Sequence, residues 1–449
     1  MLDLSLSLGK LASPMPASLV PAPRAPFQEI TPPLSPDQAA QEAARCLFCY
    51  DAPCIAACPT EIDIPRFIQR ISTGDTVGAA ETILSANILG GSCARVCPVE
   101  VLCEGSCVEK TLTKRPVPIG RLQRFATDHV LSRGIEVLRA GKATGKSVGI
   151  IGAGPAGLGA AAELRKLGHA VTIYDERAWG GGLNTYAMAE YKQTAALAVA
   201  EVEQVQKLGA ELKQGVRIGR EPSEVSIDEL LAKHELIFIG VGLGATGKLG
   251  IPGDDAGHVR EALAWIEELK VAPEKMARLD GKQAVIIGGG NTAIDAVTQA
   301  RRLGAEATLV YRRSEQQMSA YRYEIELARS MACTLLFERS PARVEGTTLV
   351  VAGPRGEETL AADLIIAAIG QQKRSEFLRS LPGVQLDEKS RLRVASDTHR
   401  TDNPRIYAGG DCVNGGKEAV NAVAEGKKAA RAMHAQLSSG VGQHQEARR

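Results

Sequence analysis

Two stretches of the chain repeat the same order of apolar and glycine-rich segments. A short apolar run at residues 146–151 precedes the sequence GAGPAG, and a second at residues 284–287 precedes GGGNTA. Each glycine-rich turn opens a stretch of helical character, and another apolar run follows at residues 170–174 and 307–310. A strand, a tight glycine turn, a helix and a second strand make up a dinucleotide-binding unit. The pattern therefore predicts two nucleotide-binding folds.

The N-terminal part of the chain has a different pattern. Seven prolines between Pro14 and Pro33 exclude a regular helix and predict an extended tail over residues 1–33, either mobile or lying along a neighbouring surface. The motif Ser35-Pro-Asp-Gln38 combines an N-cap, a proline at the first helical position and a capping-box glutamine. It predicts a helix that carries Cys46 and Cys49 near its end.

Length and composition fit a multidomain α/β protein. At roughly 150 residues per domain, 449 residues predict about three domains. The formal net charge of +1 makes nucleic acid and an anionic membrane improbable partners. We expect a cytoplasmic protein, because no run approaches 18 consecutive apolar residues and no secretory signal is recognisable.

Eight of the ten cysteines are concentrated between Cys46 and Cys107. A disulfide framework needs an oxidising compartment, which nothing here indicates. Structural zinc favours paired C-x2-C elements, and the longer intervals of this region fit it poorly. Thiolates spaced three to five residues apart on short turns can surround iron–sulfur clusters, and Cys58-Pro59 matches the ferredoxin rule in which such a cysteine binds the other cluster. Chemistry alone favours thiolate ligands throughout, Cys93 included.

The first glycine-rich turn carries a complete dinucleotide fingerprint. Its three glycines permit a tight turn, close approach of a pyrophosphate and close helix packing, and the acid that ends the second strand accepts a hydrogen bond from a ribose hydroxyl. The fingerprint predicts FAD and not FMN, which has no adenosine pyrophosphate. The predicted residues are Gly152, Gly154, Pro155, Ala156, Gly157, Asp175 and Glu176.

The second turn predicts a nicotinamide nucleotide site. No acid ends its second strand, which runs instead into two arginines. An arginine pair accommodates a 2′-phosphate, so NADP(H) is favoured over NAD(H), although two solvated surface arginines would look the same. The predicted residues are Gly289, Gly290, Asn291, Thr292, Arg312 and Arg313.

A third motif lies near the C-terminus. A strand at residues 405–408 ends in Gly410-Asp411, and residues 417–420 lead into a helix. This resembles flavoprotein reductases, in which the aspartate meets the ribityl hydroxyls of FAD and the helix start faces the flavin ring, which implies that Asp411, Ala419 and Val420 bind FAD with Gly410. Because flavin residues flank the nicotinamide unit, that unit is an insertion.

Together these motifs resemble the amino-terminal half of dihydropyrimidine dehydrogenase, and the small subunit of glutamate synthase is similar. The resemblance runs from about Ser35 to about His434. It implies that Cys46, Cys49, Cys54 and Cys107 bind one [4Fe-4S] cluster and that Cys58, Cys97, Cys103 and Gln123 bind a second. Gln123 thereby takes the place that chemistry alone gives to Cys93, and both stay candidates.

The same resemblance adds residues beside the nucleotides. It places Gly182 and Leu183 in a loop beside the flavin and Lys192 near the flavin phosphates, where many relatives have an arginine. A further segment near the nicotinamide consists of Ala368, Ile369 and Gly370.

The expected architecture is α/β, with a helical N-terminal iron–sulfur domain followed by two nested Rossmann-like domains of the flavoprotein pyridine nucleotide oxidoreductase type. The iron–sulfur domain is expected at residues 34–143. The FAD-binding domain is expected at 144–255 and 373–449, on both sides of an NAD(P)H-binding domain at 256–372.

The expected reaction is electron transfer. The body of the chain has no C-x-x-C pair of the kind that disulfide reductases use, and Cys412 is expected to be a small buried residue. The resemblance implies hydride transfer from NAD(P)H to FAD and electron transfer through the clusters to a partner, the FMN/iron–sulfur catalytic subunit that reduces uracil or thymine to 5,6-dihydropyrimidines. The alternatives are an input subunit for glutamate synthase or another acceptor, and a non-catalytic redox-sensing adaptor.

Overall fold

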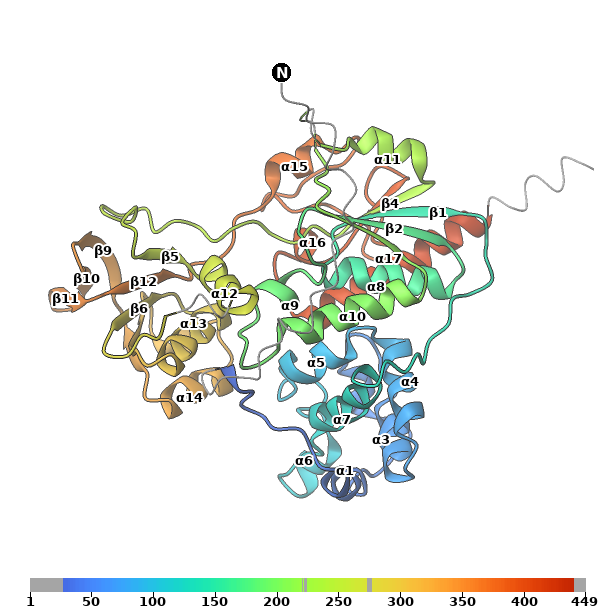
Figure 1. Ribbon diagram of the computed structural model, residues 1–449, viewed down its shortest axis with the longest axis horizontal. Helices are drawn as coiled ribbons and strands as arrows, with labels where there is room; N and C mark the ends of the chain where they lie inside the picture. The colour runs from blue at the N-terminus through green and yellow to red at the C-terminus, as the bar shows by residue number, and fades with distance from the viewer. Residues whose placement is uncertain (1–26, 220, 222–223, 273–276, 440–449) are drawn as a thin grey trace, which may run out of the picture.

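The computed structural model describes residues 27–219, 221, 224–272 and 277–439, which form one helical region and two parallel sheets (Figure 1). Most of the predicted N-terminal tail lies outside the described residues. The α/β fold with two nested nucleotide-binding units is as predicted.

The first helical region packs around a core of buried apolar side chains. The capping box between Ser35 and Gln38 is present, as predicted. The first helix ends at Ala43, however, so Cys46 and Cys49 lie in a turn beyond it and not near its end; Phe48 has a φ of 50° there, which no helix allows. The helices are α1 (Pro36–Ala43), α2 (Pro53–Ala56), α3 (Ile64–Ser72), α4 (Thr76–Ala86), α5 (Gly90–Val96), α6 (Val108–Leu112) and α7 (Ile119–Leu131).

The second region is a five-stranded parallel sheet in the order β13-β4-β1-β2-β3. Its last strand comes from the end of the chain, which shows that a long segment is inserted between β4 and β13. The strands are β1 (Ser147–Ile151), β2 (Ala170–Asp175), β3 (Glu211–Gln214), β4 (Leu236–Ile239) and β13 (Ile406–Ala408). The helices are α8 (Pro155–Lys166), α9 (Leu183–Tyr186), α10 (Ala195–Lys207), α11 (Ile227–Lys233), α15 (Ser375–Ser380), α16 (Asp411–Asn414) and α17 (Ala419–Ser439).

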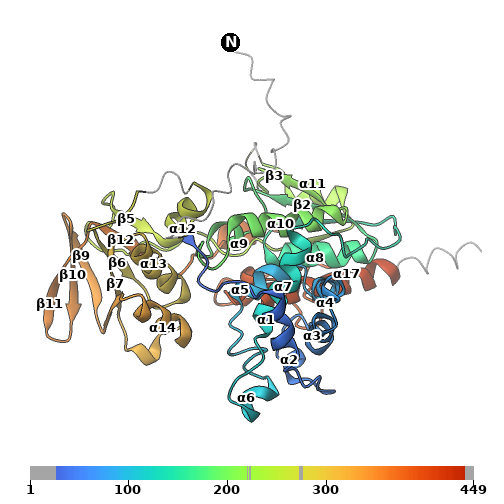
Figure 2. The same ribbon diagram turned by 60° about the horizontal axis from the view of Figure 1, so that its bottom comes forward.

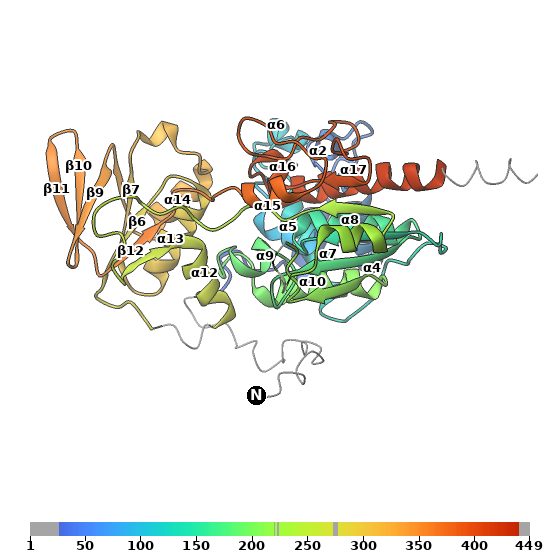
Figure 3. The same ribbon diagram turned by 90° about the horizontal axis from the view of Figure 1, so that it is seen from above.

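The inserted segment forms a second five-stranded parallel sheet in the order β5-β12-β6-β7-β8. A three-stranded antiparallel sheet, which the sequence patterns did not predict, covers its outer end (Figure 3). The parallel strands are β5 (Val259–Glu261), β6 (Gln283–Ile287), β7 (Glu306–Tyr311), β8 (Thr334–Phe337) and β12 (Leu364–Ala367). The other elements are α12 (Ala262–Val271), α13 (Asn291–Arg302), a 3-10 turn (Glu315–Gln317), α14 (Arg322–Ser330), β9 (Ser340–Glu345), β10 (Thr348–Gly353) and β11 (Gly356–Ala361).

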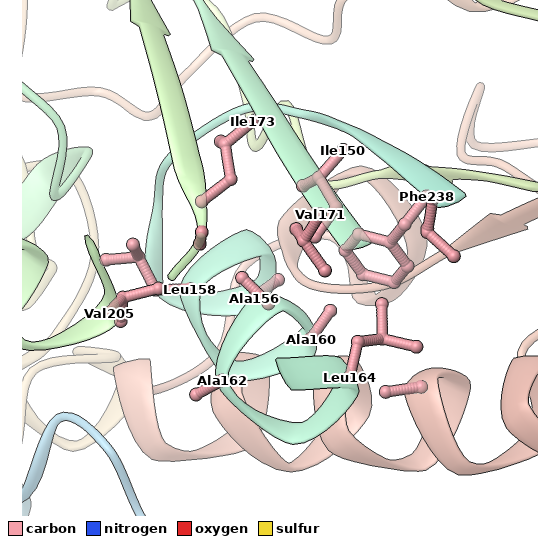
Figure 4. Packing of buried hydrophobic residues seen from close by; sticks show 14 of the residues in the cluster. Ile150, Ala156, Leu158, Ala160, Ala162, Leu164, Val171, Ile173, Val205 and Phe238 are labelled. Atoms are coloured by element: carbon pink, nitrogen blue, oxygen red, sulfur yellow. The ribbon is translucent and has the colours of Figure 1, made fainter. Parts of the chain in front are cut away.

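Helices α8 and α17 pack against each other at the centre of the first sheet's core. A Cβ atom at Gly426 would overlap the carbonyl oxygen of Ala156, and one at Gly159 would press on the backbone of Val423. The opposite face of α8 packs under the strands, with Phe238 and other strand side chains around it (Figure 4). The two glycines therefore set how closely the C-terminal helix approaches the first helix of the dinucleotide unit.

Residues 27–34 cross all three regions and are not a free tail. Phe27 is buried in the core of the inserted unit, and Leu34 is buried in the core of the helical region. Between them, the amide of Ile30 donates to the carbonyl of Tyr191, and Glu29 pairs with Arg95. This part of the predicted tail ties the chain's own domains together, because it has apolar ends that two separate cores bury.

We expect Gly426→Ala to lower the free energy of unfolding by roughly 1–3 kcal/mol, because the added methyl group forces α17 away from α8. Chemical denaturation measures this difference. Gly257→Ala is the matched control, since a Cβ atom there meets nothing within 4 Å, and it should change stability by less than about 0.5 kcal/mol.

Candidate cofactor-binding sites

The first glycine-rich turn leaves room for a pyrophosphate at one position only. Gly152 has a φ of 101°, and a Cβ atom at Gly157 would overlap the carbonyl of Gly152, so both glycines are required by the turn itself. A Cβ atom at Gly154 would meet nothing closer than 3.9 Å. Gly154 is the N-cap of α8, so open space lies at the positive end of a helix dipole, where phosphate groups bind.

The acid after β2 is held by the same turn. Asp175 accepts hydrogen bonds from the backbone amides of Ala153 (2.7 Å) and Arg177 (2.8 Å). Burial raises the pKa of this carboxyl, and the two amides act against that rise. The neighbouring Glu176 turns to the surface instead, where it pairs with Arg374 at 3.0 Å.

Two further predicted segments meet this turn. Gly182, the N-cap of α9, which begins at Leu183, lies against the backbone of Gly154. Gly410, with a φ of 77°, lies against Ala156, which brings Asp411 and the start of α17 to the same place. Residues from three distant parts of the sequence, including Ala419 and Val420, are therefore gathered around the N-terminus of α8.

Sequence reasoning missed the residue that holds the Asp411 loop. Glu425 accepts a hydrogen bond from the amide of Gly410 (2.7 Å) and another from the side chain of Asn414 (3.0 Å). Asp411 itself is partly buried, which raises its pKa, and it accepts a hydrogen bond from the amide of Lys417. No motif marks Glu425, because its role depends on α17 folding back beside the loop. Cys412 is buried, as expected.

Lys192 forms an ion-pair cluster that the sequence did not predict. Its ammonium is buried 2.6 Å from Asp295 and 2.5 Å from Glu324, which both belong to the inserted unit. Burial lowers the pKa of Lys192, but the two carboxylates outweigh it and hold the pKa above its usual value. Tyr191 donates its hydroxyl to Asp295 at 3.1 Å. Lys192 therefore joins the two nucleotide-binding units through two buried carboxylates, and its contact with flavin phosphates stays a prediction.

The second glycine-rich turn has its own supporting segment. A Cβ atom at Gly289 would collide with the ring of Tyr311, while Gly290 has space around it. Asn291 accepts a hydrogen bond from the amide of Tyr321 at 3.0 Å. The neighbouring Thr292 is part of the first turn of α13. The turn thus presents the helix N-terminus, as in the first unit.

Arg312 and Arg313 directly follow β7, next to this turn, and both side chains are exposed. No acid ends β7, which terminates in Tyr311. The two guanidinium groups are therefore accessible to an anionic ligand at the end of the strand.

The predicted nicotinamide segment lies where the chain crosses between the two units. The amide of Ala368 donates to Ile287, directly before the second glycine turn, and Gly370 has a φ of 101°. Ile369 between them is 47% exposed, which is unusual for an isoleucine. This exposed side chain is therefore accessible to a ligand beside the second turn.

Four of the clustered cysteines line one cavity in the helical region. They are Cys46, Cys49, Cys54 and Cys107. Apolar side chains, among them Ile64, complete the wall. Burial, followed by repulsion from Cys107 and Cys46, raises the pKa of the Cys54 thiol to about 12. Crowded, half-buried thiols of this kind lose their protons when iron is bound, so the residues present fit a cluster.

The remaining four cysteines form a second group. A hydrogen bond shared with Cys93, burial, and repulsion from Cys103 and Cys58 raise the pKa of the Cys97 thiol. Gln123 is buried nearby on α7, where its amide nitrogen donates to the carbonyl of Gly90 at 2.7 Å. Its side-chain oxygen is the atom left to ligate iron. The structure thus brings Cys93 to the other thiols and keeps Gln123 close to the helix that carries Cys93.

The two thiol groups differ in their distance from the nucleotide-binding units. The backbone carbonyl of Thr60, two residues after Cys58, accepts a hydrogen bond from Lys427 of α17. The amide of Ser92, next to Cys93, donates to Glu201 of α10 at 2.9 Å. At the junction with the inserted unit, Tyr321 donates its hydroxyl to Glu418, just before α17, at 2.6 Å. The second group is therefore on the inner face of the helical region, whereas α1 and α6 beside the first group lie at its far end (Figure 1, Figure 2).

Two other kinds of site are absent from the described residues. No three His, Cys, Asp or Glu side chains there converge on a single metal ion. No helix in the described ranges has the length and apolar character needed to cross a membrane.

Two family models match the chain. Residues 23–135 match dihydropyrimidine dehydrogenase domain II, 4Fe-4S cluster, and residues 146–426 match pyridine nucleotide-disulphide oxidoreductase. The NAD-dependent dihydropyrimidine dehydrogenase subunit PreT of Escherichia coli O157:H7 is 36% identical over 91% of this chain and 96% of its own length. This chain belongs to the family that contains PreT. The NADPH glutamate synthase small chain of Escherichia coli K12, 33% identical over 90% of this chain and 92% of its own length, is a relative as well.

Membership of the PreT-containing family makes the chain an oxidoreductase with a 4Fe-4S domain and a flavin-dependent pyridine nucleotide domain. The fold agrees with that of solved flavoprotein reductases. Thioredoxin reductase of T. acidophilum superimposes with a TM-score of 0.54 and 21% identity over 65% of this chain and 99% of its own. The superposition covers 65% of this chain. The family model of the iron–sulfur domain matches residues 23–135.

We expect Lys192→Met to lower the free energy of unfolding by roughly 3–5 kcal/mol, because it leaves Asp295 and Glu324 buried without their cation. Thermal or chemical unfolding measures the loss. Lys213→Met removes an exposed ion pair and serves as the control, with an expected change below about 1 kcal/mol. Equal stability of both variants would contradict the role of Lys192 between the two units.

Proposed function

We propose that this chain is the electron-input subunit of a cytoplasmic dihydropyrimidine dehydrogenase. When bound, NAD(P)H supplies hydride to FAD, and two [4Fe-4S] clusters carry single electrons to an FMN/iron–sulfur partner subunit that reduces uracil or thymine to the 5,6-dihydropyrimidine. The observation that carries the proposal is the position of the second thiol group. It lies on the side of the helical region that contacts α17 and α10 of the flavin-type unit.

In this proposal, the inner face of the helical region faces the flavin. The residues gathered at the start of α8 hold the pyrophosphate and ribityl parts of FAD, with Asp411 on the ribityl hydroxyls. The N-termini of α8 and α17 both point their positive ends into this place, which favours negative charge there. Residues 289–292 and 368–370 hold the nicotinamide nucleotide.

For the clusters, we propose the ligand sets implied by the family resemblance. Cys46, Cys49, Cys54 and Cys107 hold the outer cluster, and Cys58, Cys97, Cys103 and Gln123 hold the inner one. Cys93 is the competing ligand, and its hydrogen bond with Cys97 supports it. The two assignments differ in one measurable respect, namely which single substitution removes a cluster.

The accessible position of Arg312 and Arg313 supports a preference for NADP(H) over NAD(H). The names of the relatives point both ways, since PreT is NAD-dependent and the glutamate synthase small chain is paired with NADPH. A role as the small subunit of glutamate synthase is the second candidate function, because this relative matches the chain over nearly the same length.

Anaerobically purified protein should contain about eight iron and eight acid-labile sulfide atoms per chain, as two [4Fe-4S] clusters require. Cys93→Ser should keep this content, whereas Gln123→Leu should lose or perturb one cluster. Iron analysis and electron paramagnetic resonance of the reduced protein test both variants. Full cluster content in Gln123→Leu together with loss in Cys93→Ser would assign the ligand to Cys93.

Substitution of both Arg312 and Arg313 by alanine should reduce the advantage of NADPH over NADH in flavin reduction. One charge-assisted contact with a phosphate contributes roughly 1.5–3 kcal/mol, which corresponds to about 10- to 150-fold in specificity. Stopped-flow reduction of the bound flavin by each nucleotide measures the ratio. An unchanged ratio would show that the two arginines are ordinary surface residues.

The isolated chain should oxidise NADPH with an artificial acceptor but should reduce uracil or thymine only with an FMN/iron–sulfur dihydropyrimidine dehydrogenase subunit present. Pyrimidine-dependent NADPH oxidation before and after addition of that purified subunit is the deciding measurement. Electron delivery to the large subunit of glutamate synthase, and none to the dihydropyrimidine dehydrogenase subunit, would establish the second candidate instead.

A further inference from the structure

Exposed apolar side chains are concentrated in the helical region. Of the large apolar side chains that the structure describes as exposed, all but Ile369 lie between residues 47 and 112. Monomeric proteins rarely expose grouped apolar side chains without a binding role. The helical region therefore exposes apolar side chains that no other described part of the chain covers.

Four of these side chains belong to the two segments that line the outer thiol cavity. Leu47 (50% exposed), Phe48 (41%) and Tyr50 (99%) lie in the turn between α1 and α2, and Leu112 (63%) ends α6. We call these four residues the apolar collar. The turn and α6 both contribute walls to the cavity. The collar therefore lies on the two segments that flank the site at which the outer cluster is proposed to bind.

The backbone of the collar is strained at one position. Phe48 has a φ of 50°, a region that bulky side chains rarely occupy. Strain of this kind persists where a functional arrangement requires it. The strained residue lies between Cys46 and Cys49, which line the cavity, and its own aromatic ring is partly exposed to solvent.

The charges next to the collar are mainly positive. Lys110 and Lys114 are exposed on either side of Leu112, and no ion pair is found for either among the described residues. Arg115 is already neutralised by Glu42. The one exposed acid in the turn is Asp51. A protein that binds here is therefore favoured by an apolar surface with acidic groups at its edge.

We propose that the apolar collar is the docking surface for the electron-accepting FMN/iron–sulfur subunit, which presents an apolar patch with acidic side chains opposite Lys110 and Lys114. This inference rests on the proposed function and adds the place of contact. Electron transfer slows steeply with distance, so the acceptor has to bind where a cluster is near the surface. The inner thiol group lies on the side of the helical region that packs against α17 and α10, which leaves the outer group and its collar.

The double variant Tyr50→Ser and Leu112→Ser tests the apolar part. Both side chains are mostly in solvent, and neither lines the thiol cavity, so iron content and NADPH oxidation with a small artificial acceptor should be unchanged. Affinity for the purified FMN/iron–sulfur dihydropyrimidine dehydrogenase subunit, measured by calorimetry, should fall about thirtyfold or more, as for the loss of interface hot spots. Val77→Ser, an exposed apolar residue on α4 away from the cavity, is the matched control and should bind normally.

The double variant Lys110→Glu and Lys114→Glu tests the charge. At low ionic strength it should associate with the same subunit at least tenfold more slowly than the original chain, because steering by opposite charges is reversed. The difference should largely disappear at 1 M salt, where charges are screened within about 3 Å. A difference that is independent of salt would contradict the acidic edge proposed for the partner.

The outcomes separate this inference from the proposed function. If the original chain neither binds the subunit nor passes electrons to it, the proposed function is wrong. If it does both and the collar variants bind with unchanged affinity, only the docking surface is wrong. A collar variant that changes self-association of this chain, or deletion of residues 1–26 that releases a covered collar, would assign the surface to another occupant and would overturn the inference.

Discussion

The arrangement of the nucleotide sites depends on the close contact between α8 and α17. Gly159 and Gly426 let the two helices approach until backbone meets backbone, and no residue with a side chain fits either position without displacement. Because α17 begins directly after the Asp411 loop, this contact also fixes the loop against the first glycine-rich turn. This contact holds the N-termini of α8 and α17 together with the loops beside them. The two helices begin more than 250 residues apart in the sequence.

A second set of contacts holds the inserted unit in place. Lys192 pairs with two buried carboxylates of the inserted unit. Residues 27–34 form a strap whose two ends are buried in the cores of the inserted unit and of the helical region. Buried ion pairs contribute little net stability but strongly disfavour arrangements that separate the charges. The position of the inserted unit is thus specified by interactions that tolerate little displacement, and the link from Tyr321 to Glu418 lies at the same junction.

The helical region has an inner and an outer side with different properties. Its inner side carries the second thiol group. There Lys427 of α17 donates to the carbonyl of Thr60, and the amide of Ser92 donates to Glu201 of α10. Its outer side carries the first thiol group and the apolar collar. Such an arrangement suits a protein that takes in electrons at one face and gives them up at another, and it agrees with membership of the PreT-containing family.

The sequence alone determined the local units. Glycine turns at Gly152 and Gly288, the strands around them and the capping box at Ser35 are short-range features, so spacing and residue type were enough to predict them. The insertion followed from the order of motifs along the chain. The cysteine spacing indicated clusters, and the division into two ligand groups came from a family resemblance.

Only the tertiary structure decided which residues meet. The fold gives Lys192 the partners Asp295 and Glu324, which lie more than 100 residues away in the sequence and carry no motif. Glu425 escaped prediction for the same reason. For the N-terminal tail the sequence predicted a position along a neighbouring surface as one alternative, but it could not name the two cores that bury the ends of the strap at residues 27–34. Long-range contacts depend on the packing of whole elements, and a local pattern cannot encode which distant charge or core a side chain will reach.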